Sequence, residues 1–153
     1  MTATTTRATV QQEHDLRTLM QRFIDDVINA QDLDQALVEL VAENFVELNP
    51  LPGQGQGRTG LASALGTMFA GFPDLHWTVH DTLVEGDRVM GFSTWTGTHL
   101  GGFMGIPATG RTVTIEAWTI DRFHDGIFVE SRIIMDVAGL LGQLGILPAP
   151  EAA

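Results

Sequence analysis

The sequence predicts an α+β fold, in which a curved antiparallel β-sheet is wrapped by helices from the N-terminal half. Hydrophobic residues in the first half recur at helical spacing, whereas the second half changes to the period of strands. The second half also carries two hairpin turn signals, Glu85-Gly86-Asp87 and His124-Asp125-Gly126. Helices followed by a run of hairpin-linked strands are the order typical of an α+β domain.

Three helices are expected before the sheet and one after it. The first covers 10–28, where the apolar residues of one face are Leu16, Leu19, Met20, Phe23, Ile24, Val27 and Ile28. A shorter helix covers 33–41. A third, over 61–69, ends at Phe72-Pro73-Asp74, and the last covers 137–145 and ends at Gly145.

Five strands are expected. A short one covers 44–50, ends at Pro50 and is followed by a glycine-rich loop. Residues 75–99 predict two strands around Gly86, and 111–123 and 127–136 predict two more around Gly126. No repeat or linker interrupts the chain. Residues 1–153 are therefore expected to form one domain, with frayed ends at 1–9 and 148–153.

The composition limits the partners. The formal net charge is −11, whereas nucleic acids and anionic membranes require a basic face, so neither is expected to bind. The absence of cysteine excludes disulfides, thiol nucleophiles and thiolate metal sites. No signal peptide or run of transmembrane length is recognisable, and the protein is expected to be cytoplasmic.

Two features of the sequence resemble ligand-binding motifs but do not meet the requirements of such motifs. The glycines at 53, 55 and 57 lack the Lys-Ser/Thr ending of a phosphate-binding loop and do not follow a strand of a βαβ unit. The five histidines do not form a ligand set, because the closest pair, His76 and His80, lies in a predicted strand. We expect neither a metal nor a cofactor.

The last predicted strand carries polar residues whose roles stay open. By alternation, Ser131, Ile133 and Met135 share one face, and Glu130 and Arg132 share the other. Asp136 directly precedes the last helix, so it is either an N-cap or an acid at the edge of a pocket. The strand at 111–123 is largely apolar on both faces, which predicts a homodimer through the outer face, with Trp118 and Ile120 contributing.

Three segments resemble the SnoaL-like polyketide cyclases, within the larger nuclear-transport-factor-2-like and limonene-epoxide-hydrolase-like superfamily. They are FVELNP (45–50), GTHLGGFMGIPATGR (97–111) and HDGIFVESRIIMDVAGLLGQLG (124–145). The resemblance covers residues 16–147. It implies a cone-shaped α+β fold with an apolar cavity, usually homo-oligomeric and working without a cofactor.

The resemblance also implies where a site would lie. SnoaL-type aldol cyclases place a general acid/base aspartate at the position of Ile133, and limonene epoxide hydrolases have an aspartate there after an arginine that matches Arg132. The cyclases' pocket histidine and glutamine match Thr119 and Ala117, and their asparagine persists as Asn49. Because isoleucine has no proton to exchange, the usual catalytic acid is absent.

Three functional interpretations follow. The first is an enzyme with another acid or base, chosen from Glu47, His99, Asp121 and Asp136, with Asn49 anchoring a substrate oxygen. A cofactor-free hydroxylase or epoxide-hydrolase-like enzyme belongs to this group. The second is a cyclase that mainly folds an apolar polyketide or polyene into its reactive shape. The third is a non-catalytic module that binds small molecules.

The leading hypothesis is a cofactor-independent cyclase of polyketide biosynthesis that acts on an apolar intermediate, by shape-directed cyclisation if Ile133 leaves it without an acid. The loop 100–110 is expected to be a mobile lid, because its glycines allow hinge motion and its apolar residues face a ligand. The expected substrate contacts are Trp95, Phe103, Met104, Ala117, Thr119, Ser131, Ile133 and Met135.

Overall fold

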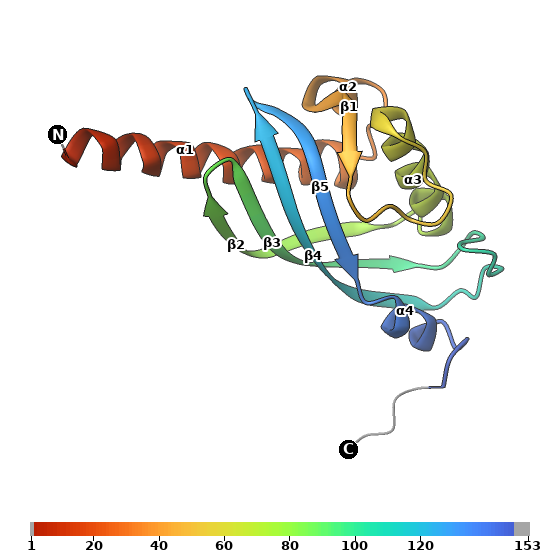
Figure 1. Ribbon diagram of the computed structural model, residues 1–153. Coiled ribbons are helices and arrows are strands. Elements are labelled where there is room, and N and C mark those ends of the chain that lie inside the picture. The colour runs from red at the N-terminus through yellow and green to blue at the C-terminus, as the bar shows by residue number, and fades with distance from the viewer. Residues whose placement is uncertain (1, 149–153) are drawn as a thin grey trace, which may run out of the picture.

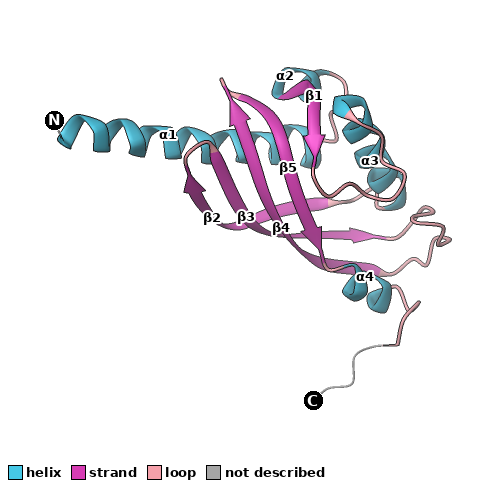
Figure 2. Ribbon diagram, viewed as in Figure 1, coloured by secondary structure: helices cyan, strands magenta, loops and turns pink. Residues whose placement is uncertain are grey.

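The computed structural model describes residues 2–148, with side chains from residue 9 onward. Figure 1 shows the elements in chain order, and Figure 2 separates helices from strands. The helices are α1 (Thr2–Arg22), the π-helix η1 (Phe23–Asn29), α2 (Gln35–Leu40), α3 (Gly57–Gly71) and α4 (Val137–Gln143). The strands are β1 (Val41–Glu47), β2 (His76–Glu85), β3 (Arg88–Thr98), β4 (Thr112–His124) and β5 (Ile127–Met135).

The five strands form one curved, open sheet in the order β1-β5-β4-β3-β2 (Figure 1). The α+β prediction is therefore confirmed. One pair differs from the antiparallel expectation, since β1 pairs in parallel with β5. This strand enters from the helical layer, so no tight turn imposes the antiparallel direction that links β2 to β3 and β4 to β5.

The helical layer begins with α1, which runs directly into η1 (Figure 1). In η1 the residues Phe23, Ile24, Val27 and Ile28 are all buried. The first turns of α1 lie in the segment expected to fray, and residues 149–153 of the expected tail lie outside the described residues. No helix in the described part of the chain has the length and apolar composition needed to cross a membrane.

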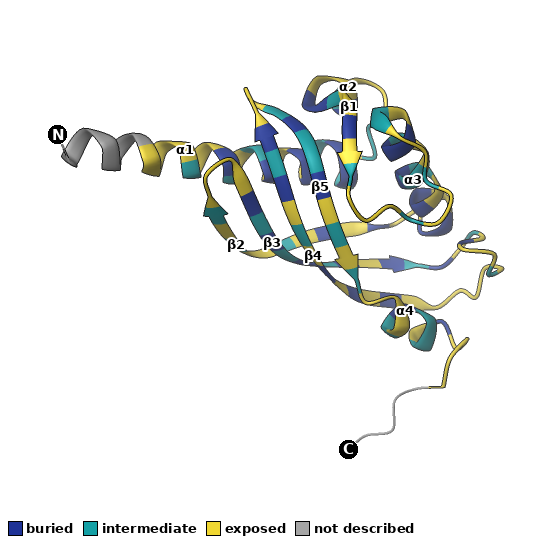
Figure 3. Ribbon diagram, viewed as in Figure 1, coloured by how far each residue is buried: buried dark blue, intermediate teal, exposed yellow. Residues whose placement is uncertain are grey.

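Buried and exposed residues alternate along the strands, as the bands of colour along β4 show (Figure 3). On the inner face of β4 the residues Val113, Ile115, Ala117 and Asp121 are buried beneath the helices. On its outer face the side chains alternate outward, and Trp118 is 47% exposed. This alternation places the core, and any cavity within it, between the inner face of the sheet and the helical layer.

Candidate active site

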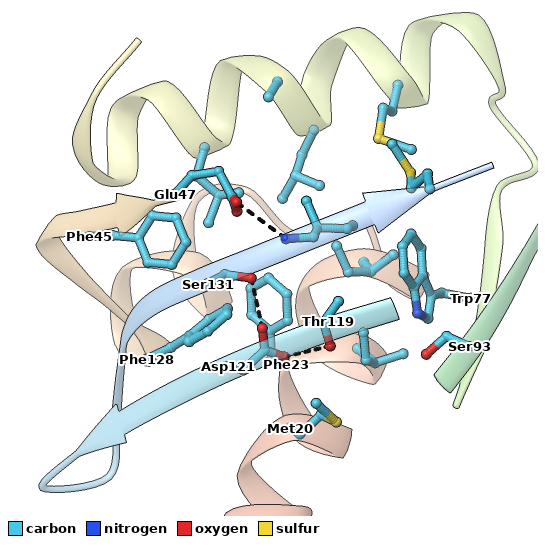
Figure 4. Close-up of a pocket in the computed structure, with 18 of the residues that line it drawn as sticks. Met20, Phe23, Phe45, Glu47, Trp77, Ser93, Thr119, Asp121, Phe128 and Ser131 are labelled. Atoms are coloured by element: carbon cyan, nitrogen blue, oxygen red, sulfur yellow. Dashed lines mark hydrogen bonds between the residues drawn. The ribbon is translucent and has the colours of Figure 1, made fainter. Parts of the chain in front are cut away.

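An apolar cavity lies between α3, η1 and the inner face of the sheet (Figure 4). Its volume is about 90 Å³. The walls carry four aromatic rings (Phe23, Phe45, Trp77 and Phe128) and three methionines (Met20, Met68 and Met135). The polar residues that line it are Glu47, Gln54, Ser93, Thr119, Asp121 and Ser131. A largely apolar hollow with a few polar groups is the usual form of a small-molecule site.

Local sequence explains why the hollow forms here. The π-helix η1 contributes Phe23, Ile24 and Ile28 to the wall, and π-helical segments are frequent at functional sites. On β3, Gly91 faces Met20, whose Cε would lie 3.1 Å from a Cβ at that position. A glycine at 91 therefore lets the flexible Met20 side chain lie against the sheet at the edge of the cavity.

Asp121 is the buried carboxylate of the cavity. It projects from β4, is 6% exposed, and accepts hydrogen bonds from Ser131 Oγ at 2.7 Å and Thr119 Oγ1 at 3.2 Å (Figure 4). Burial raises the pKa of Asp121 to about 7, the two hydroxyl hydrogen bonds lower it, and the charge of Glu47 raises it. A carboxyl with this pKa exchanges protons near neutral pH.

Glu47 is a second carboxyl, at the end of β1. Its Oε1 accepts from the backbone N–H of Asn49 at 2.9 Å and of Ile133 at 3.3 Å. Burial raises the pKa of Glu47, while hydrogen bonds from these two amides and from Ser131, and the charge of Arg132, lower it. The two carboxyls thus lie on either side of Ser131.

Ser131 lies between the two carboxyls. Its hydroxyl carries one proton to donate, and it donates that proton to Asp121 Oδ1 at 2.7 Å. Glu47 is held by the backbone N–H groups of Asn49 and Ile133. Asp121 is therefore the carboxyl of the two that is held by side-chain hydroxyls inside the apolar hollow.

The structure brings six of the thirteen residues expected at the site to the cavity wall. They are Glu47, Thr119, Asp121, Ser131, Ile133 and Met135. The last three alternate along β5 as predicted, while Arg132 is exposed and lies outside the wall. Thr119 pairs with Ile133 across the sheet, and Asp121 pairs with Ser131.

Asn49 is not placed to anchor a substrate in the cavity. It is exposed, and its Nδ2 donates to the carbonyl of Ile133 at 2.6 Å. Its backbone N–H holds the carboxylate of Glu47. In this structure Asn49 therefore fixes the chain after β1 against β5 and orients the carboxyl of Glu47.

His99 and Asp136 also lie away from the cavity. His99 is fully buried, stacks on Phe72 at 5.2 Å, and its Nδ1 lies 3.0 Å from Thr109 Oγ1. Asp136 is exposed and is the N-cap of α4, accepting from the N–H of Gly139 at 2.8 Å. The capping alternative explains this aspartate, because a free N–H of the first turn is satisfied.

The remaining expected contacts belong to the core or to a neighbouring groove. Trp95 and Ala117 are fully buried outside the cavity wall. Phe103 is buried against Phe72 at 5.4 Å, and Leu100 and Gly101 donate to the carbonyl of Gly71. The loop 100–110 is thus pinned to α3 and does not cover the cavity, because Phe103 and Met104 line a separate groove.

Sequence reasoning missed several wall residues. Trp77 takes the place expected for Trp95, and alternation along β2 could have identified its inward face. Leu51 and Gln54 come from the glycine-rich loop, where no period predicts direction. Within the part of the chain with described side chains, no group of three or more His, Cys, Asp or Glu residues could hold a metal ion.

A curved, open sheet wrapped by helices around an apolar hollow defines a cone-shaped α+β protein. The family model described as SnoaL-like polyketide cyclase matches residues 18–144. The chain belongs to the SnoaL-like polyketide cyclase family. No curated protein sequence matches this chain significantly.

Solved structures agree with this assignment. TsrD from Streptomyces laurentii is 30% identical, with a TM-score of 0.79 over 88% of this chain and 97% of that one. IdmH from Streptomyces antibioticus, a candidate polyketide cyclase, is 31% identical, with a TM-score of 0.75 over 85% and 98%. AclR from Streptomyces galilaeus, a candidate hydroxylase, is 27% identical, with a TM-score of 0.77 over 90% and 86%.

Proposed function

We propose that this protein is a cofactor-independent cyclase that binds an apolar polyketide-like intermediate and closes a ring, with Asp121 as the general acid/base. The observation that carries this proposal is a buried carboxyl whose pKa is raised to about 7, inside an otherwise apolar cavity. A general base is most effective when its pKa lies near the working pH. Asp121 meets that condition.

The position of Asp121 compensates for the isoleucine at 133. Asp121 pairs with Ser131 across the sheet, two residues along β5 from the pair formed by Thr119 and Ile133. The carboxyl is therefore on the neighbouring strand but still enters the same hollow. Asp121 would take a proton from a carbon next to a substrate carbonyl, and the resulting enolate would attack a second carbonyl. The proton then returns to the new alkoxide, so the enzyme is unchanged.

Cofactor-free hydroxylation is the second candidate, and the likeness to AclR favours it. It would begin with the same proton removal by Asp121, after which the carbanion combines with molecular oxygen to give a hydroperoxide in place of attacking a carbonyl. An external thiol would then reduce the hydroperoxide to the alcohol and water, and would itself be oxidised to a disulfide. The two functions differ in their need for oxygen. Turnover that persists under anaerobic conditions with a product isomeric with the substrate, or its dehydrated form, supports ring closure.

The pH dependence of proton transfer tests the role of Asp121. In deuterated buffer, the protein should exchange the α-hydrogens of nonan-2-one, a simple apolar ketone. The catalysed rate should rise about tenfold per pH unit below the pKa of Asp121 and level off above about 7, because only the ionised carboxylate accepts a proton. If the exchange rate with protein does not change between pH 5 and 8 and is no higher than the rate in buffer alone, the proposal is refuted.

The exposed outer face supports a homodimer as the assembled form. Phe92, Trp118 and Ile134 are neighbours across β3, β4 and β5, and the rings of Phe92 and Trp118 lie 4.6 Å apart. Ile134 is 60% exposed and Ile120 is 40% exposed. A second copy that covers this patch would need about 800 Å² per partner for a stable pair.

Sedimentation velocity checks the dimer. The wild-type protein is expected to sediment as a dimer at micromolar concentration, and Trp118→Glu as a monomer, because a buried unpaired charge opposes association. Val38→Glu is the matched control, since Val38 is 54% exposed on α2. It should remain a dimer. A monomeric wild type would contradict the prediction.

A further inference from the structure

The cavity at Asp121 is small for the substrate class proposed above. Its volume is about 90 Å³, whereas pockets that hold drug-sized ligands span roughly 300–1,000 Å³. The three methionines in the wall can adjust their shape, but they cannot provide that difference alone. If the protein acts on a polyketide-like intermediate, part of that molecule must lie in a space next to the cavity.

Such a space lies on the far side of a shared wall. A groove of about 340 Å³, which we call the outer groove, runs between α3 and the loop that carries Phe103 and Met104. Leu51, Gln54 and Ala64 line both this groove and the cavity. The two hollows are therefore neighbours, and these three residues are the partition between them.

The outer groove is suited to an apolar chain. Phe103 and Met104 form one side, and Met104 is 47% exposed at the tip of its turn. On α3, the hydroxyl of Thr67 donates to the carbonyl of Ser63, so its proton is already used within the helix. Leu51, Ala64, Phe103 and Met104 give the groove apolar contact, and its polar side chains, Gln54, Ser63 and Thr67, are uncharged, which favours an alkyl or polyene segment over a charged one.

Two of the three partition residues, Leu51 and Gln54, belong to a turn whose hydrogen bonds are made mainly within the turn itself. Gln54 N–H donates to the carbonyl of Leu51 at 2.9 Å, and Leu51 N–H donates to Gln54 Oε1 at 3.0 Å. Among the described residues, neither makes a hydrogen bond to another element. The turn can therefore move without breaking hydrogen bonds to the rest of the fold.

The chain is fixed on both sides of this turn. Before the turn, Asn49 donates hydrogen bonds to the carboxyl of Glu47 and to the carbonyl of Ile133. After it, Gly60 lies so close to the carbonyl of Gly55 that a side chain at 60 would overlap it, and Gly57 has a φ of +70°. These anchors keep the ends of the segment in place, so a movement would be confined to residues between them.

The geometry points to an elongated substrate site, in which the reacting end of the molecule lies at Asp121 and its apolar tail lies in the outer groove, with the Leu51–Gln54 turn displaced between them. This inference rests on the proposed function and adds a substrate class, namely intermediates with a long unbranched apolar tail. The amide Nε2 of Gln54 has no acceptor among the described residues. It can donate to a substrate oxygen at the passage between the two hollows.

Binding of linear methyl ketones from hexan-2-one to tetradecan-2-one, measured by calorimetry at pH 6, tests the inference. At this pH the protonated Asp121 can donate to the ketone oxygen. Each added methylene that enters an apolar site should raise affinity about fourfold. For the wild type, the rise should continue to the long ketones, because the tail has room beyond the cavity.

Two variants at threonines of α3 form a matched pair. Thr67→Trp places an indole in the outer groove, whereas Thr59→Trp makes the same change at an exposed position of α3 that lines neither hollow. Thr67→Trp should bind short ketones like the wild type and bind tetradecan-2-one at least tenfold more weakly. Thr59→Trp should match the wild type at every length.

The outcomes separate this inference from the proposed function. Ile133→Trp fills the inner cavity and should lower the affinity for the shortest ketones most. If short ketones bind, Ile133→Trp weakens them, and Thr67→Trp has no effect on long ones, the outer groove is refuted and the cavity remains the site. If no ketone of any length binds, the proposed function fails together with the inference.

Discussion

Asp121→Asn is expected to lower catalysed proton transfer by about 10²–10⁴-fold, the usual contribution of a general acid/base. The change removes the titrating group and keeps the shape of the side chain. Ser131 and Thr119 hold the two oxygens of Asp121 through hydroxyls that can rotate, so each can also accept from the new amide. The loss of activity should therefore occur in a folded protein.

The same substitution should stabilise the fold at neutral pH. The folded state raises the pKa of Asp121 from 3.8 to about 7, so within that window it binds more protons than the unfolded state. Stability from this group is present below pH 3.8 and is lost as the pH rises through the folded pKa. Asp121→Asn removes that loss. The free energy of unfolding of the variant should therefore exceed that of the wild type by an amount that grows between pH 4 and pH 7 and reaches on the order of a few kcal/mol.

Asp136→Asn is the matched control for Asp121→Asn. Asparagine is as good an N-cap as aspartate, so stability should change by no more than about 0.5 kcal/mol. Because Asp136 caps α4 away from the cavity, its variant should exchange the α-hydrogens of nonan-2-one at the wild-type rate. Kinetics and urea denaturation of both variants check this. Equal activity losses at 121 and 136 would contradict the assignment of Asp121 as acid/base.

The sequence predicted correctly the features that a local rule determines, such as a hairpin turn or the face of a strand on which a side chain lies. Asp125-Gly126 formed the expected hairpin because both residues adopt positive φ, 48° and 77°, which a type I′ turn requires. Alternation along β5 likewise predicted that Ser131, Ile133 and Met135 share an inward face. The parallel pairing of β1 with β5 had no such local signal, since it joins segments far apart in the chain.

The candidate active site was less predictable. Asp121 was one of four candidates, and only the tertiary structure shows that β4 aims it into the cavity while α4 uses Asp136 as a cap. The resemblance favoured Asn49, but the side chain is bonded to the backbone of Ile133. A short polar residue after a strand can face a pocket or bond a neighbouring carbonyl, and sequence does not distinguish these outcomes.

A cluster of aromatic rings holds the cavity wall together. The ring of Phe128 lies 4.8 Å from that of Phe23, 5.1 Å from Phe45 and 5.0 Å from Phe123. These contacts connect β5 with η1, β1 and β4, and Phe128 itself lines the cavity. One buried side chain thus joins the parallel edge of the sheet to the helical layer.

Phe128→Ala is expected to lower the free energy of unfolding by about 3–5 kcal/mol, because it removes a buried ring and leaves a void. Phe92→Ala is the control at a half-buried position of the outer face, where the ring contacts Trp118 and His80. It should cost about 1 kcal/mol, within the range of ordinary substitutions. Urea denaturation of both variants at equal protein concentration measures the difference, and equal losses would show that the cluster does not hold the wall.

The void left by Phe128→Ala should also bind small ligands. It would adjoin the existing cavity and be lined by the remaining rings, and dry apolar voids of this kind bind small aromatic molecules. Toluene should therefore raise the unfolding midpoint of Phe128→Ala by mass action and have a smaller effect on Phe92→Ala. No such difference would mean that the wall collapses when Phe128 is removed, because a collapsed wall leaves no site for toluene to fill.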